Sequence, residues 1–109
     1  MTTMRNQDLL DPAALQQALA DLPLWQLDAT RGALTRQFRF ASFAEAFGFM
    51  AEIALHAERH DHHPEWSNVY DRVTVTWTSH DVQGVSARDV VLARLCDAAA
   101  ARRLQTPAP

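Results

Sequence analysis

The sequence has no lysine, one cysteine and no long apolar run. The sequence has ten arginines and thirteen acidic residues, which give a net charge of −3. It therefore lacks the excess of basic residues that a general nucleic-acid binder needs. Cys96 has no partner for an intramolecular disulfide, and a cysteine-based zinc cluster is all but excluded. No stretch reaches the roughly 20 apolar residues of a membrane span, and the N-terminus lacks a signal-peptide core. We therefore expect a soluble, cytoplasmic protein that contacts neither nucleic acid nor membrane.

The residues that are present suit one globular domain. The chain has 109 residues, 48% of them hydrophobic, and a typical domain has roughly 100–150 residues. We expect a single domain over residues 1–104. Residues 105–109 include two prolines and are predicted to form a disordered tail outside the fold.

Hydrophobic spacing predicts a helix and a β-hairpin in the first forty residues. Asp11 followed by Pro12 is a typical helix start, and Pro23 ends that helix. Alternating apolar residues on both sides of 30–32 predict two strands. Arg36 interrupts the apolar face of the second strand, so we expect that face to be only partly enclosed.

A long helix is predicted next. Ser42 and Glu45 have the spacing of a capping box, and Pro64 must end the helix by about His62 or His63. Apolar residues at helical spacing form one stripe: Phe43, Ala46, Phe47, Met50, Ala54 and Ala57. Phe49 and Ile53 extend the apolar surface beyond that stripe. The surplus fits a subunit interface or a wide core face equally well.

The remaining elements are strand-like residues 68–78 and a last helix. Asp71-Arg72 is either a turn between two short strands or part of one long strand. Ser86 and Asp89 repeat the capping spacing and predict a helix to about Arg103. The order is therefore helix, two strands, helix, two short strands, helix.

Four of the five histidines fall within eight positions: His56, His60, His62 and His63. Histidine gives and takes protons near neutral pH and also binds metals, so the cluster indicates proton transfer or a metal site. His56 and His60 have the i, i+4 spacing of zinc-binding helices, but the His-Glu-x-x-His order is absent. We favour two solvated helix residues and expect no metal.

The compact unit for proton transfer is Asp61-His62-His63-Pro64-Glu65-Trp66, in which the two adjacent imidazoles must point in different directions. His80 stands beside Asp81 at the end of the last predicted strand and could converge on the same cleft. Glu58 precedes His62 by one helical turn and is expected to lie close to it.

These motifs resemble the pterin-4a-carbinolamine dehydratases, also called 4a-hydroxytetrahydrobiopterin dehydratases. The resemblance extends from about Leu9 to Ala99, and its strongest segments are 61–66, 68–70, 78–81 and 86–89. It implies an α+β fold in which three helices pack on one face of a four-stranded antiparallel sheet, in the order α-β-β-α-β-β-α.

The resemblance also implies an enzyme, a lyase of the dehydratase type. Such enzymes remove water from 4a-hydroxytetrahydrobiopterin, or 4a-hydroxytetrahydropterin, to give quinonoid dihydropterin. They thereby recycle the pterin cofactor of aromatic amino-acid hydroxylases and need no cofactor of their own. By motif, His62 and His80 are the expected acid/base pair, and His63 is the third catalytic histidine, which binds the substrate.

Further pterin-binding residues are implied by the same motifs: Asp61, Trp66, Thr78, Ser79, Asp81 and Asp89. For Asp89 three roles stay open: orienting an imidazole, holding a pterin nitrogen, or capping the last helix. Trp66 could stack on a flat heterocycle, although aromatic residues of this kind are more often part of the core.

The family also assembles, which implies a homodimer or homotetramer formed through the 43–57 helix. Some relatives act without catalysis, as dimerisation cofactors of a transcription factor or as assembly factors, and this is the alternative function. Such relatives would not need the histidines. Because all three are present here, we favour catalysis over a purely binding role.

Overall fold

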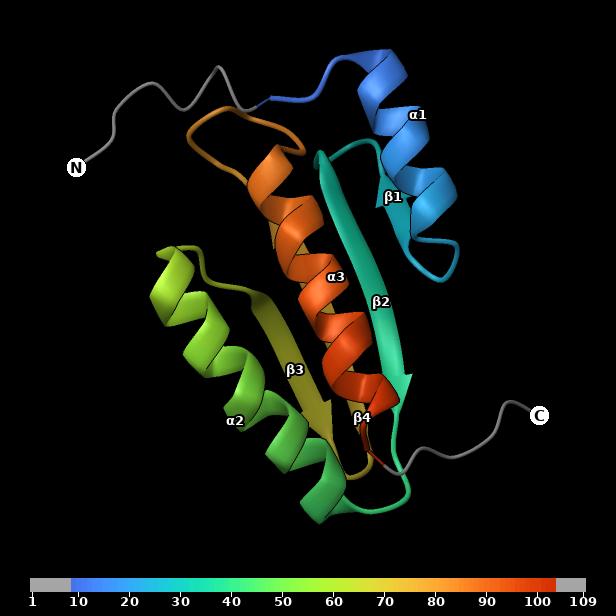
Figure 1. Cartoon of the computed structure of the whole chain (residues 1–109), viewed down its shortest axis with the longest axis vertical. Helices are drawn as coiled ribbons and strands as arrows, with labels where there is room; N and C mark the ends of the chain where they lie inside the picture. Colours follow the sequence, from blue (N-terminus) through green and yellow to red (C-terminus); the bar gives the residue numbers. More distant parts are fainter. Residues whose placement is uncertain (1–8, 104–109) are drawn as a thin grey trace.

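The computed structural model describes residues 9–103, and the elements follow the expected order (Figure 1). The tail predicted at 105–109 lies outside the described residues. Between residues 9 and 103, no helix is both long and apolar enough to cross a membrane. The elements are α1 (Pro12–Asp21), β1 (Gln26–Asp28), β2 (Ala33–Arg39), α2 (Phe43–His60), β3 (Glu65–Val69), β4 (Arg72–Thr78) and α3 (Ala87–Ala101).

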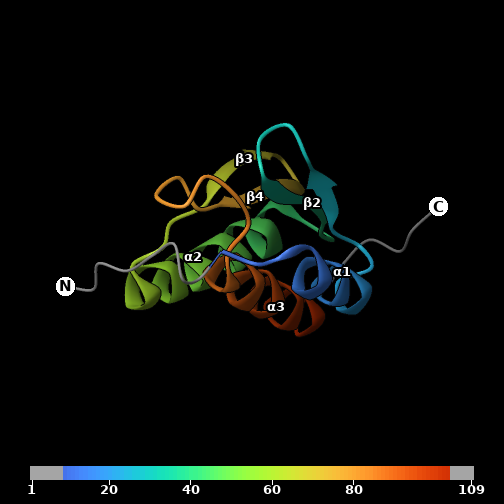
Figure 2. The same ribbon diagram turned by 90° about the horizontal axis from the view of Figure 1, so that it is seen from above.

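The four strands form one antiparallel sheet in the order β1-β2-β4-β3. Strands β2 and β4 lie at its centre and pair from Ala33 opposite Thr78 to Arg39 opposite Arg72. Figure 2 shows the three helices together on one face of the sheet. The fold is therefore α+β with the predicted order of elements.

The run that ends at Thr78 forms two strands, which settles the alternative left open by the sequence. The turn between β3 and β4 falls at Tyr70 and Asp71, and Tyr70 adopts a left-handed backbone with a φ of 54°. The turn therefore lies one residue before the expected position. Strand β3 also begins at Glu65, three residues earlier than the predicted Asn68.

The core fills the space between the sheet and the helices. The side chains of Leu34, Phe38 and Trp77 lie on the helix-facing side and are fully buried. Arg36 stands in the same row, yet its Nη1 donates to Asp97 Oδ1 at 2.6 Å and its guanidinium lies 4.1 Å from the centre of the Phe38 ring. The expectation of a partly open face was therefore wrong, because α3 supplies a carboxylate that allows the arginine to be enclosed.

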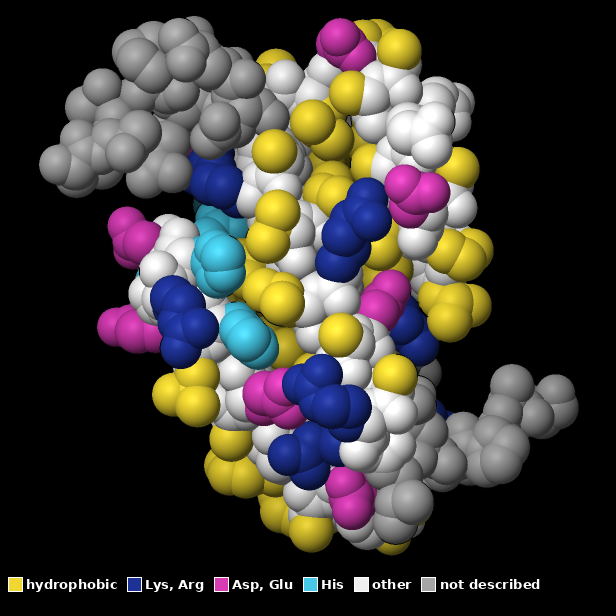
Figure 3. Space-filling model, viewed as in Figure 1, with side chains coloured by type: hydrophobic (Ala, Val, Ile, Leu, Met, Phe, Trp, Pro, Cys, Tyr) yellow, Lys and Arg dark blue, Asp and Glu magenta, His cyan; other side chains and the backbone are white. Residues whose placement is uncertain are grey.

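The face that helix α2 turns to the core only partly matches the predicted stripe, of which Ala46 and Ala57 are buried. The buried residues are Ala46, Phe49, Ile53 and Ala57, so the surplus apolar residues Phe49 and Ile53 belong to a wide core face. Three large apolar side chains remain exposed instead: Phe43 (49%), Phe47 (58%) and Leu55 (71%). Figure 3 shows hydrophobic side chains gathered over the lower end of α2.

Candidate active site

The end of α2 explains why two adjacent histidines point in different directions. Asp61 adopts the left-handed conformation (φ 50°, ψ 45°) and caps the helix, with its N–H directed at the carbonyls of Ala57 and Glu58. The helix thus ends at His60, slightly before the limit that Pro64 sets. The reversal turns His62 inward, where it is only 8% exposed, and leaves His63 on the surface.

His62 is held between an aromatic ring and a carboxylate. Its Nε2 lies 2.6 Å from Oδ1 of Asp89, which is fully buried at the start of α3. Its ring stacks on Trp77 of β4, with centroids 5.7 Å apart and an interplanar angle of 20°. A buried polar group needs such partners, and together they fix the orientation of the imidazole.

Asp89 performs two of the three roles considered for it. Besides orienting His62, it accepts hydrogen bonds at Oδ2 from the Ser86 N–H and from Ser79 Oγ, both at 2.8 Å. The first bond completes the capping box of α3. Binding of a pterin nitrogen stays a prediction, and the complete burial of the carboxylate argues against it.

His80 occupies a contrasting environment. Ser79 is buried at the end of β4, but the side chain of the next residue, His80, is 79% exposed. Its Nε2 lies 3.1 Å from Oε2 of Glu65, whose other oxygen accepts a hydrogen bond from Arg31. Both hydrogen bonds lower the pKa of Glu65, and the bond from Arg31 has the larger effect.

Glu65 is a residue whose role the sequence analysis missed. It stands in the 61–66 motif, which could have drawn attention to it, but nothing in the sequence indicates its partners. Glu58 was expected near His62 and instead contacts His63, with 2.9 Å between Glu58 Oε1 and His63 Nε2. The side chain of His62 is directed inward to Asp89 instead of to Glu58.

Each of the three expected catalytic histidines directs Nε2 at a carboxylate. An ionised carboxylate only accepts hydrogen bonds, so the neutral imidazole then carries its hydrogen on Nε2. This assignment follows from the hydrogen-bond partners. It leaves Nδ1 of each ring as the nitrogen with an available lone pair, which suits it to exchange a proton with a ligand.

The other expected binding residues have mixed positions. Thr78 Oγ1 donates to the Gly32 carbonyl at 2.9 Å, and Asp81 forms a two-pronged ion pair with Arg88 at 3.0 and 3.1 Å. Asp61 is exposed, while Trp66 is half-buried and packs against the core. Of the expected site residues, His62, Ser79 and Asp89 are in direct contact, and His80 adjoins them through the chain.

The two earlier histidines of the cluster lie on α2. His56 Nε2 is 3.9 Å from Glu52 Oε2, and His60 is exposed. Among residues 9–103, no group of three or more His, Cys, Asp or Glu side chains is arranged to hold a metal ion.

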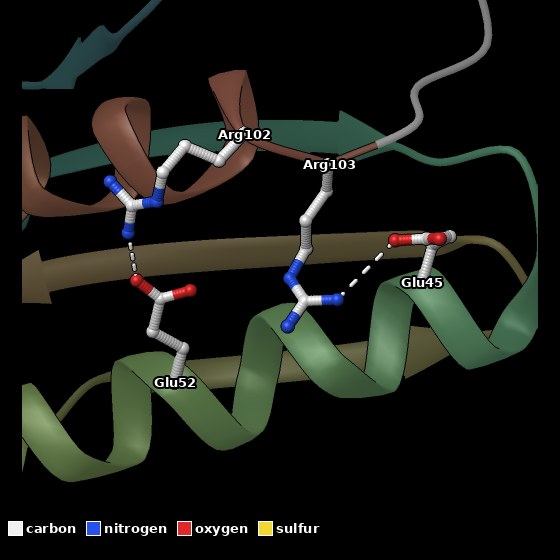
Figure 4. A pocket seen from close by; sticks show the side chains of 4 residues that line it. All are labelled: Glu45, Glu52, Arg102 and Arg103. Carbon is white, nitrogen blue, oxygen red and sulfur yellow. Dashed lines mark hydrogen bonds and ion pairs between the residues drawn. The ribbon is translucent and has the colours of Figure 1, made fainter.

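A polar pocket, whose lining includes none of the three expected catalytic histidines, lies between α2 and the end of α3 (Figure 4). Arg102 pairs with Glu52, and Arg103 Nη1 lies 3.3 Å from Glu45 Oε1. The two cations and the two carboxylates neutralise one another, so this pocket offers no charge for a ligand.

Three histidines lie beside carboxylates on this α+β scaffold, one of them buried and two exposed, and such pairs are suited to acid/base chemistry. The chain belongs to the pterin 4 alpha carbinolamine dehydratase family, whose model matches residues 8–99. This match agrees with the resemblance that the motifs carried.

Individual relatives support the assignment. A protein from Rhodospirillum rubrum is 53% identical over 90 residues, covering 83% of this chain and 94% of its own. One from Rhizobium rhizogenes is 50% identical over 94 residues, covering 86% and 93%. Both carry the name "Putative pterin-4-alpha-carbinolamine dehydratase". A crystal structure from Brucella melitensis, a "transcriptional coactivator/pterin dehydratase", has a TM-score of 0.81 and 47% identity, covering 84% of this chain and 98% of that one.

Proposed function

We propose that the protein is a dehydratase that removes water from 4a-hydroxytetrahydropterin and yields quinonoid dihydropterin. Family membership and the names of the relatives support this activity. The observation that carries it is the His62–Asp89 contact of 2.6 Å, because a buried, oriented imidazole is suited to proton transfer. His80 directly follows Ser79, which also hydrogen-bonds to Asp89.

The chemistry requires one proton to be given and one to be taken. The departing 4a-hydroxyl leaves as water when an acid protonates its oxygen, and a base removes the proton from ring nitrogen N5. In this proposal His62 and His80 serve as the acid/base pair: the one that acts as acid is an imidazolium and gives its Nδ1 proton, and the other is neutral and accepts a proton at Nδ1. The proton given and the proton taken balance, so no cofactor takes part.

Substrate binding is proposed for the residues around this pair. His63 is exposed and braced by Glu58, so its imidazole can contact the pterin without leaving its partner. Asp61 stands beside His62 with its side chain in solvent. The remaining residues of the proposed binding set are Trp66, Thr78, Ser79 and Asp81, whereas Asp89, which is fully buried, is proposed to act through His62.

The experiment that tests this function follows the decay of 4a-hydroxytetrahydropterin by ultraviolet absorbance. Wild type should accelerate the decay, and His62→Ala and His80→Ala should each slow the catalysed rate by about 10²–10⁴-fold. His60→Ala is the matched control, because it removes an exposed histidine of α2 with no partner in the site. A folded wild-type protein that leaves the decay unchanged would show that the proposed activity is wrong.

A second candidate is a binding role. The description of the Brucella melitensis structure as a coactivator favours it, as do the exposed side chains of Phe43, Phe47 and Leu55 on α2. In that case His62→Ala and His80→Ala would leave partner binding unchanged. Changes on the exposed face of α2 would abolish it.

We further propose a cytoplasmic protein that recycles the pterin of an aromatic amino-acid hydroxylase and assembles as a dimer or tetramer. The single, buried cysteine fits a reducing compartment. Assembly is supported by the exposed apolar residues of α2, among which Phe43 and Phe47 contact each other, since exposed apolar patches commonly mark a protein contact.

A further inference from the structure

Glu65 joins three parts of the fold that are distant in sequence. It is the first residue of β3, Arg31 lies in the turn between β1 and β2, and His80 follows β4. One oxygen of Glu65 accepts from Arg31 Nη2, and the other lies 3.1 Å from His80 Nε2. The carboxylate thus bridges an arginine and an expected catalytic histidine at one end of the sheet.

We propose that Glu65 is a positioning residue for His80. Arg31 holds one carboxylate oxygen of Glu65, and the other oxygen accepts the hydrogen bond from the Nε2–H of His80. This bond fixes neutral His80 in the tautomer that has its hydrogen on Nε2 and a lone pair on Nδ1. This inference rests on the proposed function, in which His80 exchanges a proton with the pterin.

The exposure of His80 is the reason that it needs a positioning partner. His62 is enclosed by Trp77 and Asp89, whereas the His80 side chain is 79% exposed. Among residues 9–103, Glu65 is the side chain that forms a hydrogen bond with the His80 ring. Without Glu65, the His80 ring would rotate in solvent and populate both neutral tautomers. Fixing the ring in one orientation for proton transfer would then cost conformational entropy.

The charge state of Glu65 decides the direction of the hydrogen bond. Arg31, and after it His80, lower the pKa of Glu65 from a normal value of 4.5, so the side chain is ionised throughout the neutral range. An ionised carboxylate has no hydrogen to donate. The hydrogen between Glu65 and neutral His80 therefore belongs to Nε2.

The chain offers a matched control at Glu52. This residue also lies between an arginine and a histidine, because it pairs with Arg102 and lies 3.9 Å from His56 Nε2. It stands on α2 beside the polar pocket of Figure 4, away from the expected catalytic histidines. A Glu→Gln substitution at Glu52 therefore makes the same chemical change as one at Glu65, without affecting His80.

The kinetic test compares Glu65→Gln with Glu52→Gln. Partners that orient reactive histidines commonly contribute about 10–100-fold at metal sites, and for this exposed ring we expect a loss of roughly 10-fold in kcat with little change in KM. Glu52→Gln should match wild type. In a His80→Ala background Glu65→Gln should cause no further loss, since its effect passes through His80. Losses that multiply in the double variant would overturn the proposal.

A spectroscopic test does not depend on activity. In ¹⁵N-labelled protein, long-range nitrogen–proton correlations distinguish the two neutral forms of an imidazole, and His80→Ala identifies the His80 signals. Wild type and Glu52→Gln should show His80 with its hydrogen on Nε2, and Glu65→Gln should show a mixture or the opposite form. An unchanged His80 signal in Glu65→Gln would refute the positioning role. If wild type lacks dehydratase activity, this spectrum still decides the question, so the two failures are distinguishable.

Discussion

Asp89 serves the site and the fold with different oxygens. Oδ1 holds the buried imidazole of His62, and Oδ2 accepts the Ser86 N–H that opens α3. Under the proposed function, a substitution of Asp89 affects catalysis and stability together. Separating the two effects needs a second buried or half-buried aspartate with a purely structural role, and Asp97 provides one through its bonds from Trp25 and Arg36.

We predict that Asp89→Asn lowers both stability and activity. An amide nitrogen cannot accept hydrogen bonds, so at least one buried donor loses its partner, at a cost of about 1–3 kcal/mol in unfolding free energy. Urea unfolding and dehydratase kinetics measure the two effects. Asp97→Asn should lower stability by a comparable amount and leave the activity of the folded protein intact. Equal activity losses in both variants would contradict the role assigned to Asp89.

Cys96 allows a prediction about pH. Burial is the main reason that the pKa of its thiol rises from 9.0 to about 12. The native thiol therefore stays protonated at pH 8, and we expect a thiol-reactive dye to label it only after unfolding.

The sign of the linkage follows from that raised pKa. Because the folded value exceeds the unfolded one, the contribution of Cys96 is fully present below about pH 9 and is lost as pH rises toward 12. Urea midpoints of wild type and Cys96→Ala should therefore converge or cross as pH increases from 8 to 11. A constant difference over that range would mean that the thiol does not titrate differently on folding.

At this scale the sequence revealed residue types but not contacts. Capping at Ser86 and Asp89 is local and was predicted from spacing. The partnership of Asp89 with His62, 27 residues away, depends on how α3 lies against the sheet. The same holds for Glu65, which meets Arg31 and His80 only after the strands have paired.

At the level of elements, helix α2 shows that hydrophobic periodicity predicts a helix but not which of its apolar faces is buried. Its apolar residues form two overlapping stripes, and helical spacing predicts that one of them is buried without saying which. The sheet selects the stripe that contains Phe49 and Ile53 and leaves Phe43 and Phe47 in solvent. Helix ends were more predictable, because the serine cap at Ser42 and the proline after His63 act locally.

The turn between β1 and β2 contains a glycine that no other residue replaces easily. Gly32 has a φ of 65°, and an added Cβ would come within 2.8 Å of the Gly84 Cα in the loop that follows His80. We predict that Gly32→Ala destabilises the protein by about 1–2 kcal/mol through backbone strain. It should also reduce activity, because the displaced loop carries His80.

Gly48→Ala is the control for that prediction. The atoms nearest to its new Cβ would belong to the guanidinium of Arg103, the end of a flexible side chain, and alanine favours helix over glycine. Urea unfolding and kinetics of the two variants should therefore differ clearly. Similar behaviour of both would indicate that the approach of Gly32 to Gly84 is unimportant.

At the scale of the whole molecule, three helices cover one face of the sheet, and α2 still carries exposed aromatic residues (Figures 1 and 2). Phe43 and Phe47 contact each other, with ring centroids 5.9 Å apart. The arrangement of layers came from the family resemblance, since the order of elements alone does not determine how they pack. The proposed assembly through α2 depends on the same exposed face.

We predict that Phe47→Glu lowers the mass of the oligomer in light scattering. A buried, unpaired carboxylate in a subunit contact is strongly unfavourable, whereas Phe47 in the isolated chain is 58% exposed and free to be replaced. Leu24→Glu is the control, because Leu24 is 64% exposed and lies outside α2. Met50 is a poorer test, since it also packs against the core. An unchanged mass for Phe47→Glu would remove α2 from the interface.

The unequal burial of His62 and His80, the proposed acid/base pair, has a consequence for how such a protein changes over generations. Replacing His62 or Asp89 disturbs the start of α3, while His80 and Glu65 lie in solvent and can be exchanged at little cost to folding. In a lineage that no longer needs catalysis, substitutions would therefore accumulate first at His80 and Glu65. Descendants that keep His62 with Asp89 but have lost His80 would be former enzymes, preserved as scaffolds because half of their site is also structure.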